Sequence, residues 1–573
     1  LWSLRHTAEH VLHTALQNLY PSMKKAMGPA TADGFYHDFD VDEKISEENF
    51  STIEKEMQRI IDLNLPMVQR FVTAKEARSI FKNNPYKLEW VSDIEKRREK
   101  FSLFSIGDID TDLCSGPHAK STGAVKAFKL LSVAGAYWHG DEKNKMLTRI
   151  YGTAFPSRKE LDQYLWQIEE AKKRDHRKIG KEQELFLISP SVGLGFPLYM
   201  PKGLLLRRAL ENWIIEEKEK RGYKFVWTPH VGKSDLYKQS GHWQKYDAMF
   251  NPMKLDDDEY VVKPMNCPHH FQIYNERPRS YRELPLRLAE NATVYRNEKQ
   301  GELNGLLRVR ALTQDDTHTF VQHEQIADEI DRILELTVHI FKTFGFTDYR
   351  ARVSTRDPKT PEKYLGKKDS WDIAEQALEK ALSKRGIDYF VGLGEAAFYG
   401  PKIDIMVKDA LGREWQLTTI QLDFNQPENF NMTYIDQTGK EVRPAVLHIA
   451  ILGSFDRFLA ILIEHYAGAF PLWLSPVQLS IIPIGERHVE AAKKVLNQIK
   501  EAGIRAELND KNEPMGAKIR NATLQKIPFM AIIGDREIAD QTVSVRTRSG
   551  EDLKAIKLSD FINRLSKDIE HKL

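Results

Sequence analysis

Cysteine is scarce in this chain of 573 residues, with two copies, Cys114 and Cys267. Two thiols cannot build a disulfide scaffold, so we expect a cytoplasmic protein rather than a small secreted one. A net charge of one sign is also lacking, because 84 Lys and Arg residues stand against 82 Asp and Glu, which excludes a uniformly basic nucleic-acid coat. No apolar run reaches the roughly 18 residues of a membrane span. The best one, 459–474, is interrupted by Glu464 and Pro471, and we expect no membrane segment.

At about 150 residues per domain, the length predicts three or four domains. The chain begins at Leu1, without methionine and already inside a helical pattern, and we expect it to be a trimmed form of a longer protein. The patterning of apolar residues predicts a multidomain α+β protein. Its four parts are an α+β domain over 1–155, a linker helix over 156–181, a domain with helices and antiparallel strands over 182–475, and a small α/β domain over 476–573.

The first domain opens with a predicted amphipathic helix. Apolar residues over 4–19 recur at 3.6-residue spacing, and Pro21 ends the pattern. His6, His10 and His13 lie within a narrow arc on the other face, at about 100° per residue. We expect His13 to face solvent.

The linker segment is polar, and over 171–181 it carries six Lys and Arg residues against one Asp. Two interpretations remain open for this segment. It is either a solvated linker helix, which we favour, or a helix that lies against nucleic acid.

In the third domain, a row of mostly polar residues has the two-residue period of a strand face. The row consists of Arg308, Arg310, Leu312, Gln314, Asp316 and His318. So many polar groups on one face predict the floor of a polar cleft rather than core. A second strand is expected to end at 295–298, joined to the first by the loop 299–305.

The last domain alternates strand-like and helical patterns, as a small α/β domain does. The expected strands are 478–483, 529–534 and 542–547, and the expected helices are 489–502, 516–525 and 558–570.

Several segments of the sequence resemble the motifs of class II aminoacyl-tRNA synthetases. Tyr223 to Pro229 resembles motif 1, Tyr295 to Glu298 with Gly305 to Arg310 resembles motif 2, and Gly453 to Phe458 resembles motif 3. Two segments outside these motifs, Thr313 to Asp316 and Phe398 to Lys402, are similar to the corresponding segments of the threonyl-tRNA synthetase family. The resemblance covers essentially the whole chain, without the family's N-terminal ubiquitin-like module.

The resemblance implies an antiparallel class II sheet, an N-terminal editing domain over 1–155 and a C-terminal anticodon-binding domain over 476–573. It implies a homodimer that uses ATP with Mg²⁺ to activate L-threonine and then charges tRNA-Thr. It makes Arg296 and Arg457 catalytic and places Glu298 and Arg308 with them around ATP. A planar guanidinium suits a phosphate whose charge grows during the reaction. The implied substrate-binding residues are Met265, Gln314, Asp316, Tyr399, Lys402, Gln416 and Gln421.

Spacing alone would make Cys267 a buried thiol and His318 and His448 ordinary histidines, because no local zinc motif links them. The resemblance instead makes them the ligands of one Zn²⁺ per subunit. Three protein ligands with an open position are typical of a functional zinc. Zinc can recognise the β-hydroxyl that valine lacks, but serine has that hydroxyl and will be admitted.

The first domain supplies a candidate proofreading site. His6-x-x-x-His10 with Cys114-x-x-x-His118 would, read alone, be a four-ligand zinc site. The resemblance implies a hydrolytic pocket for mischarged seryl-tRNA-Thr, supported by Asp112 and, on a weaker match, Lys87. In the last domain it implies that Asn512, Arg520, Glu537 and Arg546 read anticodon bases.

The chain departs from the family at two positions. His269 replaces a glycine, which can adopt positive φ or permit close approach, and Ile449 replaces an arginine. We expect His269 not to bind the metal.

Two rival functions remain open at this point. A non-catalytic RNA-binding relative should lack the motif arginines Arg296, Arg308 and Arg457, which are present. A metallohydrolase built on the His6 cluster is the second rival, and counting zinc per chain would separate it from the synthetase.

Overall fold

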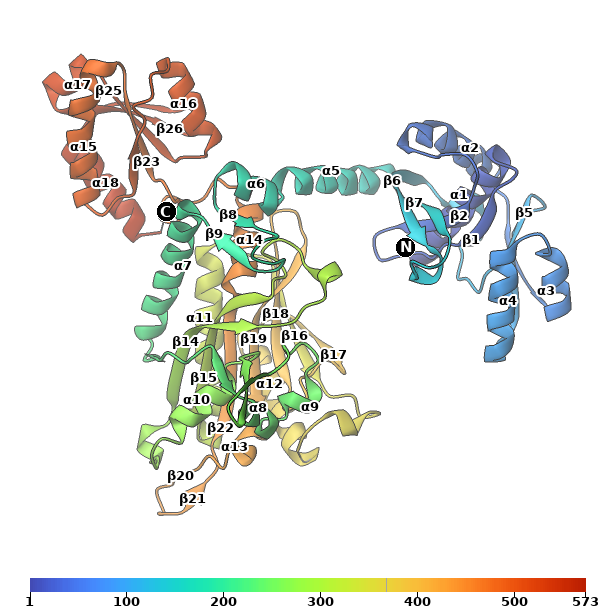
Figure 1. The fold of residues 1–573 in the computed structure, drawn as a ribbon, viewed down its shortest axis with the longest axis horizontal. Coiled ribbons are helices and arrows are strands. Elements are labelled where there is room, and N and C mark those ends of the chain that lie inside the picture. The colour runs from blue at the N-terminus through green and yellow to red at the C-terminus, as the bar shows by residue number, and fades with distance from the viewer. Residues whose placement is uncertain (367, 573) are drawn as a thin grey trace. The chain divides into compact units, whose positions relative to one another are not determined.

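The computed structural model describes residues 1–366 and 368–572. The chain forms two compact units, 1–169 and 170–573, and each is considered by itself (Figure 1).

In the first unit, helix α1 (Trp2–Leu19) packs on a four-stranded sheet of order β1-β2-β7-β6. The strands are β1 (Lys24–Met27), β2 (Phe35–Asp40), β7 (Met146–Phe155) and β6 (Ala127–Tyr137). Helix α2 (Phe50–Asp62) completes this core, to which α1 contributes Val11, Leu12 and Leu16. The predicted amphipathic helix is therefore confirmed.

A second lobe of this unit contains the three-stranded sheet β3-β4-β5 and two helices. These elements are β3 (Met67–Val72), β4 (Phe101–Ile106), β5 (Asp110–Leu113), α3 (Ala74–Ile80) and α4 (Pro85–Arg97). Helix α4 begins at a proline, and the Asn84 side chain accepts a hydrogen bond from the Lys87 backbone N–H at 3.2 Å.

The segment expected to be one linker helix forms two, α5 (Arg158–Arg174) and α6 (His176–Glu182). Asp175 separates them, and its carboxylate accepts from the Arg177 N–H at 2.8 Å and so caps α6. His176, Ile179 and Gly180 are buried. The charged residues Arg177, Lys178 and Lys181 are exposed, as a solvated helix requires, but the other face of α6 is buried.

The second unit is built on an eight-stranded sheet of order β10-β14-β15-β22-β19-β18-β16-β17. Neighbouring strands are antiparallel except for the pairs β10–β14 and β16–β17. The strands are β10 (Lys224–Phe225), β14 (Leu286–Tyr295), β15 (Ala311–Val321), β16 (Tyr349–Thr355), β17 (Tyr389–Leu393), β18 (Lys402–Lys408), β19 (Glu414–Asp423) and β22 (Ala445–Ser454).

Four helices share one large core with this sheet: α7 (Pro201–Glu219), α11 (Ile326–Thr343), α12 (Lys368–Arg385) and α14 (Phe455–His465). Smaller elements complete this part of the unit: β8 (Phe186–Ile188), β9 (Pro197–Tyr199), β11 (Val231–Lys233), α8 (Ser234–Gln239), α9 (His242–Lys245), β12 (Met253–Leu255), β13 (Asp258–Val262), α10 (Cys267–Tyr274), α13 (Gln426–Asn429), β20 (Tyr434–Ile435) and β21 (Glu441–Val442).

The polar strand face begins later than the sequence predicts, because β15 starts at Ala311. Arg308 precedes the strand in a turn, where it pairs with Asn304. The Arg310 side chain donates to the Glu298 backbone carbonyl at 3.0 Å. The expectation that Arg308 and Arg310 lie on this strand face is therefore wrong.

The C-terminal segment forms a five-stranded sheet of order β24-β23-β25-β26-β27 with its own core. Its elements are β23 (Leu479–Pro483), α15 (Val489–Glu501), β24 (Ala506–Leu508), α16 (Met515–Leu524), β25 (Phe529–Ile533), α17 (Asp535–Asp540), β26 (Thr542–Thr547), β27 (Asp552–Lys557) and α18 (Leu558–Glu570). Every strand and helix expected here is present. Across the described residues, no helix is long and apolar enough to cross a membrane.

Candidate functional site

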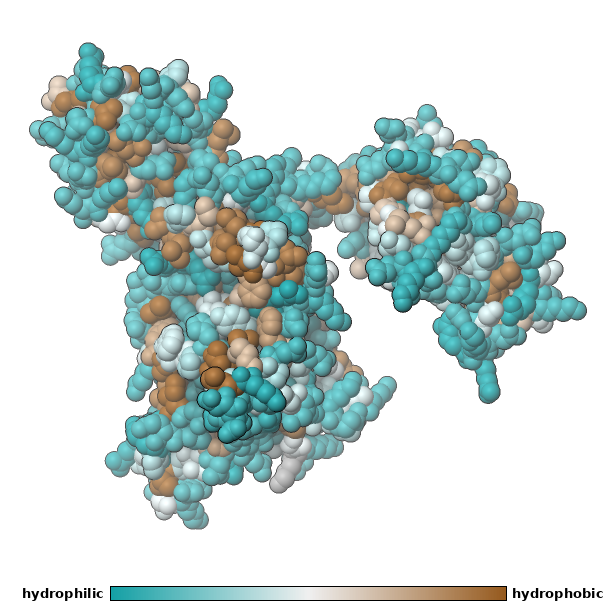
Figure 2. Space-filling view, viewed as in Figure 1, coloured by the Kyte–Doolittle hydropathy of each residue, from teal (hydrophilic) through white to brown (hydrophobic). Residues whose placement is uncertain are grey.

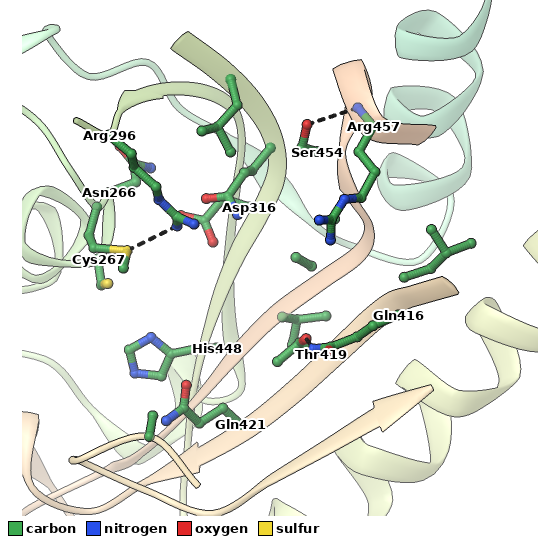
Figure 3. Close-up of a pocket in the computed structure, with 18 of the residues that line it drawn as sticks. Asn266, Cys267, Arg296, Asp316, Gln416, Thr419, Gln421, His448, Ser454 and Arg457 are labelled. Atoms are coloured by element: carbon green, nitrogen blue, oxygen red, sulfur yellow. Dashed lines mark hydrogen bonds between the residues drawn. The ribbon is translucent and has the colours of Figure 1, made fainter. Parts of the chain in front are cut away.

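A cavity of about 520 Å³ opens over strands β15, β19 and β22. Every residue with a predicted catalytic, nucleotide-binding, substrate-binding or metal role in this domain lines it: Met265, Cys267, Arg296, Glu298, Arg308, Gln314, Asp316, His318, Tyr399, Lys402, Gln416, Gln421, His448 and Arg457. Arg296 and Arg457 extend into it from opposite sides (Figure 3).

Strand β15 supplies the floor through its two-residue period. Gln314, Asp316 and His318 face the cavity. Asp315 points to the other side, is fully buried, and accepts hydrogen bonds from the Ile451 and Leu452 backbone N–H groups at 3.0 and 3.1 Å. The same strand thus separates a polar cavity from a structural carboxylate.

One end of the cavity gathers positive charge. Within the described residues, neither Arg296 nor Arg457 forms an ion pair with a carboxylate, and the Arg296 Nε atom has no hydrogen-bond partner. Burial lowers the pKa of Arg457, and the charges of Arg308 and Arg296 lower it further. Arg296 and Arg457, two neighbouring guanidinium groups without carboxylate partners, form a site for a polyanion.

Backbone and side-chain contacts fix these arginines. Ser454 caps helix α14, its hydroxyl accepting from the Arg457 N–H at 3.1 Å, and Arg457 Nε donates to the Leu307 carbonyl at 3.1 Å. Arg308 Nε donates to the Glu298 carboxylate at 3.0 Å. Arg308 Nη2 lies 3.4 Å from the Glu302 carboxylate, so two carboxylates hold this guanidinium at the edge of the cavity.

The other end of the cavity carries the Cys267, His318 and His448 group. One ligand atom from each lies within 4.8 Å of the others, and all three residues are buried. Cys267 begins α10, His318 lies on β15 and His448 lies on β22, in register with His318. The donor set and its spread suit one zinc ion with three protein ligands.

Hydrogen bonds orient the two histidines of this group. His448 Nε2–H donates to the Asp423 carboxylate at 2.9 Å, which leaves Nδ1 facing His318. His270 lies between Glu290 and His318, with its Nε2 at 3.2 Å from the Glu290 carboxylate and its Nδ1 at 2.9 Å from His318 Nδ1. His318 Nε2 and His448 Nδ1 face each other at 3.1 Å, so both nitrogens point toward the position that a metal ion would take. No spacing pattern in the sequence points to these supporting residues.

The two departures from the family are accommodated locally. His269 lies in α10 with an ordinary helical φ, so the position does not require glycine, and it is not part of the metal-competent group. Ile449 is buried in the main core.

Asp404 organises the side of the cavity opposite α10. Its carboxylate accepts from Lys402 Nζ at 2.9 Å and from Gln416 Nε2 at 2.7 Å. Gln421 Nε2 donates to the Gly400 carbonyl at 3.1 Å, next to the buried Tyr399. Asp404 was not singled out in the sequence; its partner Lys402 lies on the same strand, β18, and its partner Gln416 lies on the neighbouring strand, β19.

The first unit holds a second cavity, of about 420 Å³, lined by His6, His10, Lys87, Asp112 and Cys114. Cys114 Sγ lies 3.4 Å from His6 Nε2 and 3.3 Å from His118 Nε2. Ligand atoms of His6, His10, Cys114 and His118 all lie within 4.8 Å of one another. Lys87 Nζ donates to the Asp112 carboxylate at 2.8 Å.

Burial keeps this histidine cluster neutral. It lowers the pKa of His118 to about 3, lowers those of His6 and His10, and raises the pKa of the Cys114 thiol to about 12. At neutral pH the cluster therefore presents imidazoles that can accept a proton and a thiol that keeps its own.

The expectation for His13 is wrong, because the side chain is fully buried behind the cluster. Its Nδ1 lies 3.0 Å from Asp110, whose carboxylate also accepts from Lys25 at 2.6 Å. Lys25 from β1 and Asp110 from β5 cover His13, which was expected to face solvent.

The predicted anticodon residues are spread over the C-terminal segment. Asn512 and Arg520 are exposed, and Arg546 is half-buried on β26. The Glu537 carboxylate accepts from the Gly534 N–H at 3.0 Å and the Ser544 hydroxyl at 2.7 Å, so it also stabilises α17.

The mostly antiparallel sheet and its arginine-lined cavity define a class II aminoacyl-tRNA synthetase, and the family comparisons agree. Residues 250–466 match the family described as tRNA synthetase class II core domain (G, H, P, S and T). Residues 478–568 match the anticodon binding domain, and residues 102–151 match the threonyl and alanyl tRNA synthetase second additional domain.

Comparison with individual relatives identifies the family within this class. The chain is 50% identical to threonine–tRNA ligase of Deinococcus radiodurans over 96% of this chain and 86% of the relative. It is 49% identical to that of Rubrobacter xylanophilus over 99% and 89%. A crystal structure described as the RNA binding domain of threonyl-tRNA synthetase from Cryptosporidium parvum matches with a TM-score of 0.66 at 38% identity, covering 69% of this chain and 98% of that chain. The chain belongs to the threonine–tRNA ligase family.

Proposed function

We propose that this chain activates L-threonine with ATP in the second-unit cavity, transfers it to tRNA-Thr, and hydrolyses mischarged seryl-tRNA-Thr in the first unit. The observation that carries the proposal is the joining of two groups in one cavity, the unpaired arginines and the Cys267, His318 and His448 group. The first group suits a triphosphate and the second a small polar amino acid.

In the activation step, the threonine carboxylate attacks the α-phosphorus of ATP and the bond to pyrophosphate breaks. Arg296 would donate to the carboxylate and to the α-phosphate, where charge builds in the transition state. Arg308, Arg457 and Glu298 would hold the nucleotide at the same end of the cavity. Mg²⁺ bound with ATP would neutralise part of the charge on the leaving group.

Cys267, His318 and His448 would hold one Zn²⁺ per subunit, which would bind the amino and β-hydroxyl groups of threonine. Met265, Gln314, Asp316, Tyr399, Lys402, Gln416 and Gln421 would enclose the amino acid. A methyl-bearing substrate without the hydroxyl would leave polar groups unpaired, so valine is rejected. Serine lacks one methyl, which discriminates by only about 1–3 kcal/mol.

The histidine cluster of the first unit would remove the resulting seryl-tRNA-Thr. Neutral His6, His10 and His118 can take a proton from a water molecule that attacks the ester, and the Lys87–Asp112 pair would hold the aminoacyl group.

The four-part division at 155, 181 and 475 remains our proposal, with anticodon recognition by Asn512, Arg520, Glu537 and Arg546. We also propose a cytoplasmic homodimer. Apolar side chains gather on the exposed face over β8 and β9 (Figure 2), where Leu187 and Leu198 are exposed. Trp227, which follows β10, is 74% exposed, as an association surface would require.

ATP–pyrophosphate exchange with threonine, serine and valine tests the proposal. We expect strong exchange with threonine, weaker exchange with serine and almost none with valine. Exchange that does not depend on threonine, or that prefers valine, would refute it.

A further inference from the structure

His176 is a buried histidine that the proposed reaction does not use. It begins α6, is 1% exposed, and lies at the meeting point of three segments distant in sequence: α6, the turn 304–308 and helix α14. With Asp175 and Glu464 it forms a metal-competent group, but both of its ring nitrogens already have partners.

The partners of the ring fix its protonation state. The Leu306 backbone N–H donates to His176 Nε2 at 3.1 Å, so this nitrogen carries no proton. His176 Nδ1–H donates to the Glu464 carboxylate at 2.7 Å, and the His176 backbone N–H donates to the same oxygen at 3.2 Å. Arg413 occupies the other Glu464 oxygen. The ring is thus a neutral connector with a donor side and an acceptor side.

The turn held by His176 carries the nucleotide end of the cavity. Leu306 precedes Leu307, whose carbonyl accepts from Arg457 Nε, and Arg308, whose side chain lines the cavity. Gly305 has φ of +50°, and a Cβ atom there would lie 2.1 Å from His176 Nε2. The turn therefore lies in direct contact with the imidazole, and its backbone follows the position of that ring.

We propose that His176 is a positioning residue for the ATP end of the cavity: its Nε2 atom holds the 304–308 turn so that Arg308 and Arg457 point at the nucleotide. The inference rests on the proposed assignment of these arginines to ATP. It adds a residue from the segment between the first unit and the sheet to the determinants of nucleotide binding.

Two substitutions test the contributions of the two ring nitrogens separately. His176→Asn keeps an N–H near the Nδ1 position but has no acceptor for Leu306, whereas His176→Gln carries an amide oxygen to the Nε2 position. In ATP–pyrophosphate exchange we expect H176N to raise KM for ATP about tenfold with KM for threonine unchanged, because a buried N–H loses its acceptor. H176Q should keep KM for ATP within about threefold of the wild type.

Arg174→Ala is the matched control. Arg174 donates to the His465 carbonyl at 3.0 Å and so joins the same segment to α14 without touching the turn. It should leave both KM values at the wild-type level. Gly305→Ala gives a second, independent variant, which should raise KM for ATP as H176N does because the added Cβ displaces the turn.

Equal effects of H176N and H176Q, a change confined to kcat, or an unchanged KM for ATP in G305A would overturn the inference. Hydrogen exchange of peptides covering 299–310 should accelerate in H176N and not in H176Q. If the wild type shows no threonine-dependent exchange, the proposed function fails. Calorimetric titration with ATP then decides the positioning role by itself, and equal affinity in wild type and H176N would refute it.

Discussion

Arg296 is a half-buried cation without a carboxylate partner in the described part of the chain, and this predicts a large effect of its removal. Arg296→Ala should lower the rate of ATP–pyrophosphate exchange by at least about 10²–10³-fold, because the lost donors act on charge that develops in the transition state. Thermal stability and tRNA binding should change little. Arg350→Ala is the control, since Arg350 is exposed and paired with Glu414. Near-normal exchange in R296A would refute the assignment.

The Cys267 thiol gives a second prediction at this scale. Cys267→Ala should lose one equivalent of zinc per chain, measured by mass spectrometry of the metal, and with it threonine activation. His269→Ala should retain the zinc, because His269 lies outside the metal-competent group although it is two residues away. Two equivalents in the wild type, one of them surviving in C267A, would instead indicate a metal at the His6 cluster.

The histidines of the first unit predict an unusual pH profile for editing. A base must be neutral to act, and burial lowers the pKa of His118 to about 3 and those of His6 and His10 below the ordinary value. Their neutral forms therefore persist as the pH falls through the range in which a free histidine gains its proton, near 6.5. Deacylation of seryl-tRNA-Thr should stay flat from about pH 7.5 to about 5.5. A half-maximal rate near pH 6.5 would contradict this assignment.

At the scale of single elements, local periodicity correctly predicted where helices and strands lie. It predicted less well which of their faces are buried. The apolar repeat over 4–19 gave α1, and the alternation at Gln314, Asp316 and His318 gave the cavity face of β15. His13 was misplaced because the polar face of α1 is covered by Asp110 and Lys25, and no local pattern reports such a cover.

The supporting residues of the site were missed for a similar reason. Asp423 and Asp404 act through partners on neighbouring strands, and Glu290 acts through His270 on α10, so these contacts depend on how the whole domain folds. The metal ligands and the arginines could be assigned because they lie in segments that resemble family motifs. The residues that support them lie outside those segments, so only the structure reveals them.

Helix α1 gives a prediction about folding. Leu12 is fully buried in a core formed only by residues of the first unit. Leu12→Ala should lower the unfolding free energy of that unit by about 2–5 kcal/mol, through lost transfer energy and a cavity. Calorimetry should show an early transition shifted to lower temperature, while threonine activation at 25 °C is unchanged. A common shift of all transitions would mean that the units unfold together.

At the scale of the whole molecule, the exposed apolar residues predict association of two copies. Trp227→Asp should convert a dimer into monomers in sedimentation velocity, because a buried charge would be introduced into the contact. Ile373→Asp is the control, since Ile373 on α12 is also a highly exposed apolar residue. A monomeric wild type, or a dimeric W227D, would refute this assignment of the surface.

The alternation along β15 has a consequence for how this gene can change. Gln314 and His318 are four residues apart, about 14 Å along an extended strand, so the strand sets the distance between a substrate-facing and a metal-facing side chain. Substitutions at single positions alter one contact each. A deletion of one residue would act on side-chain order as a frameshift acts on codons: Asp315 and Thr317 would turn into the cavity, and the metal-facing and substrate-facing groups would turn into the core. The strand can therefore tolerate substitutions during evolution but not a change in its length.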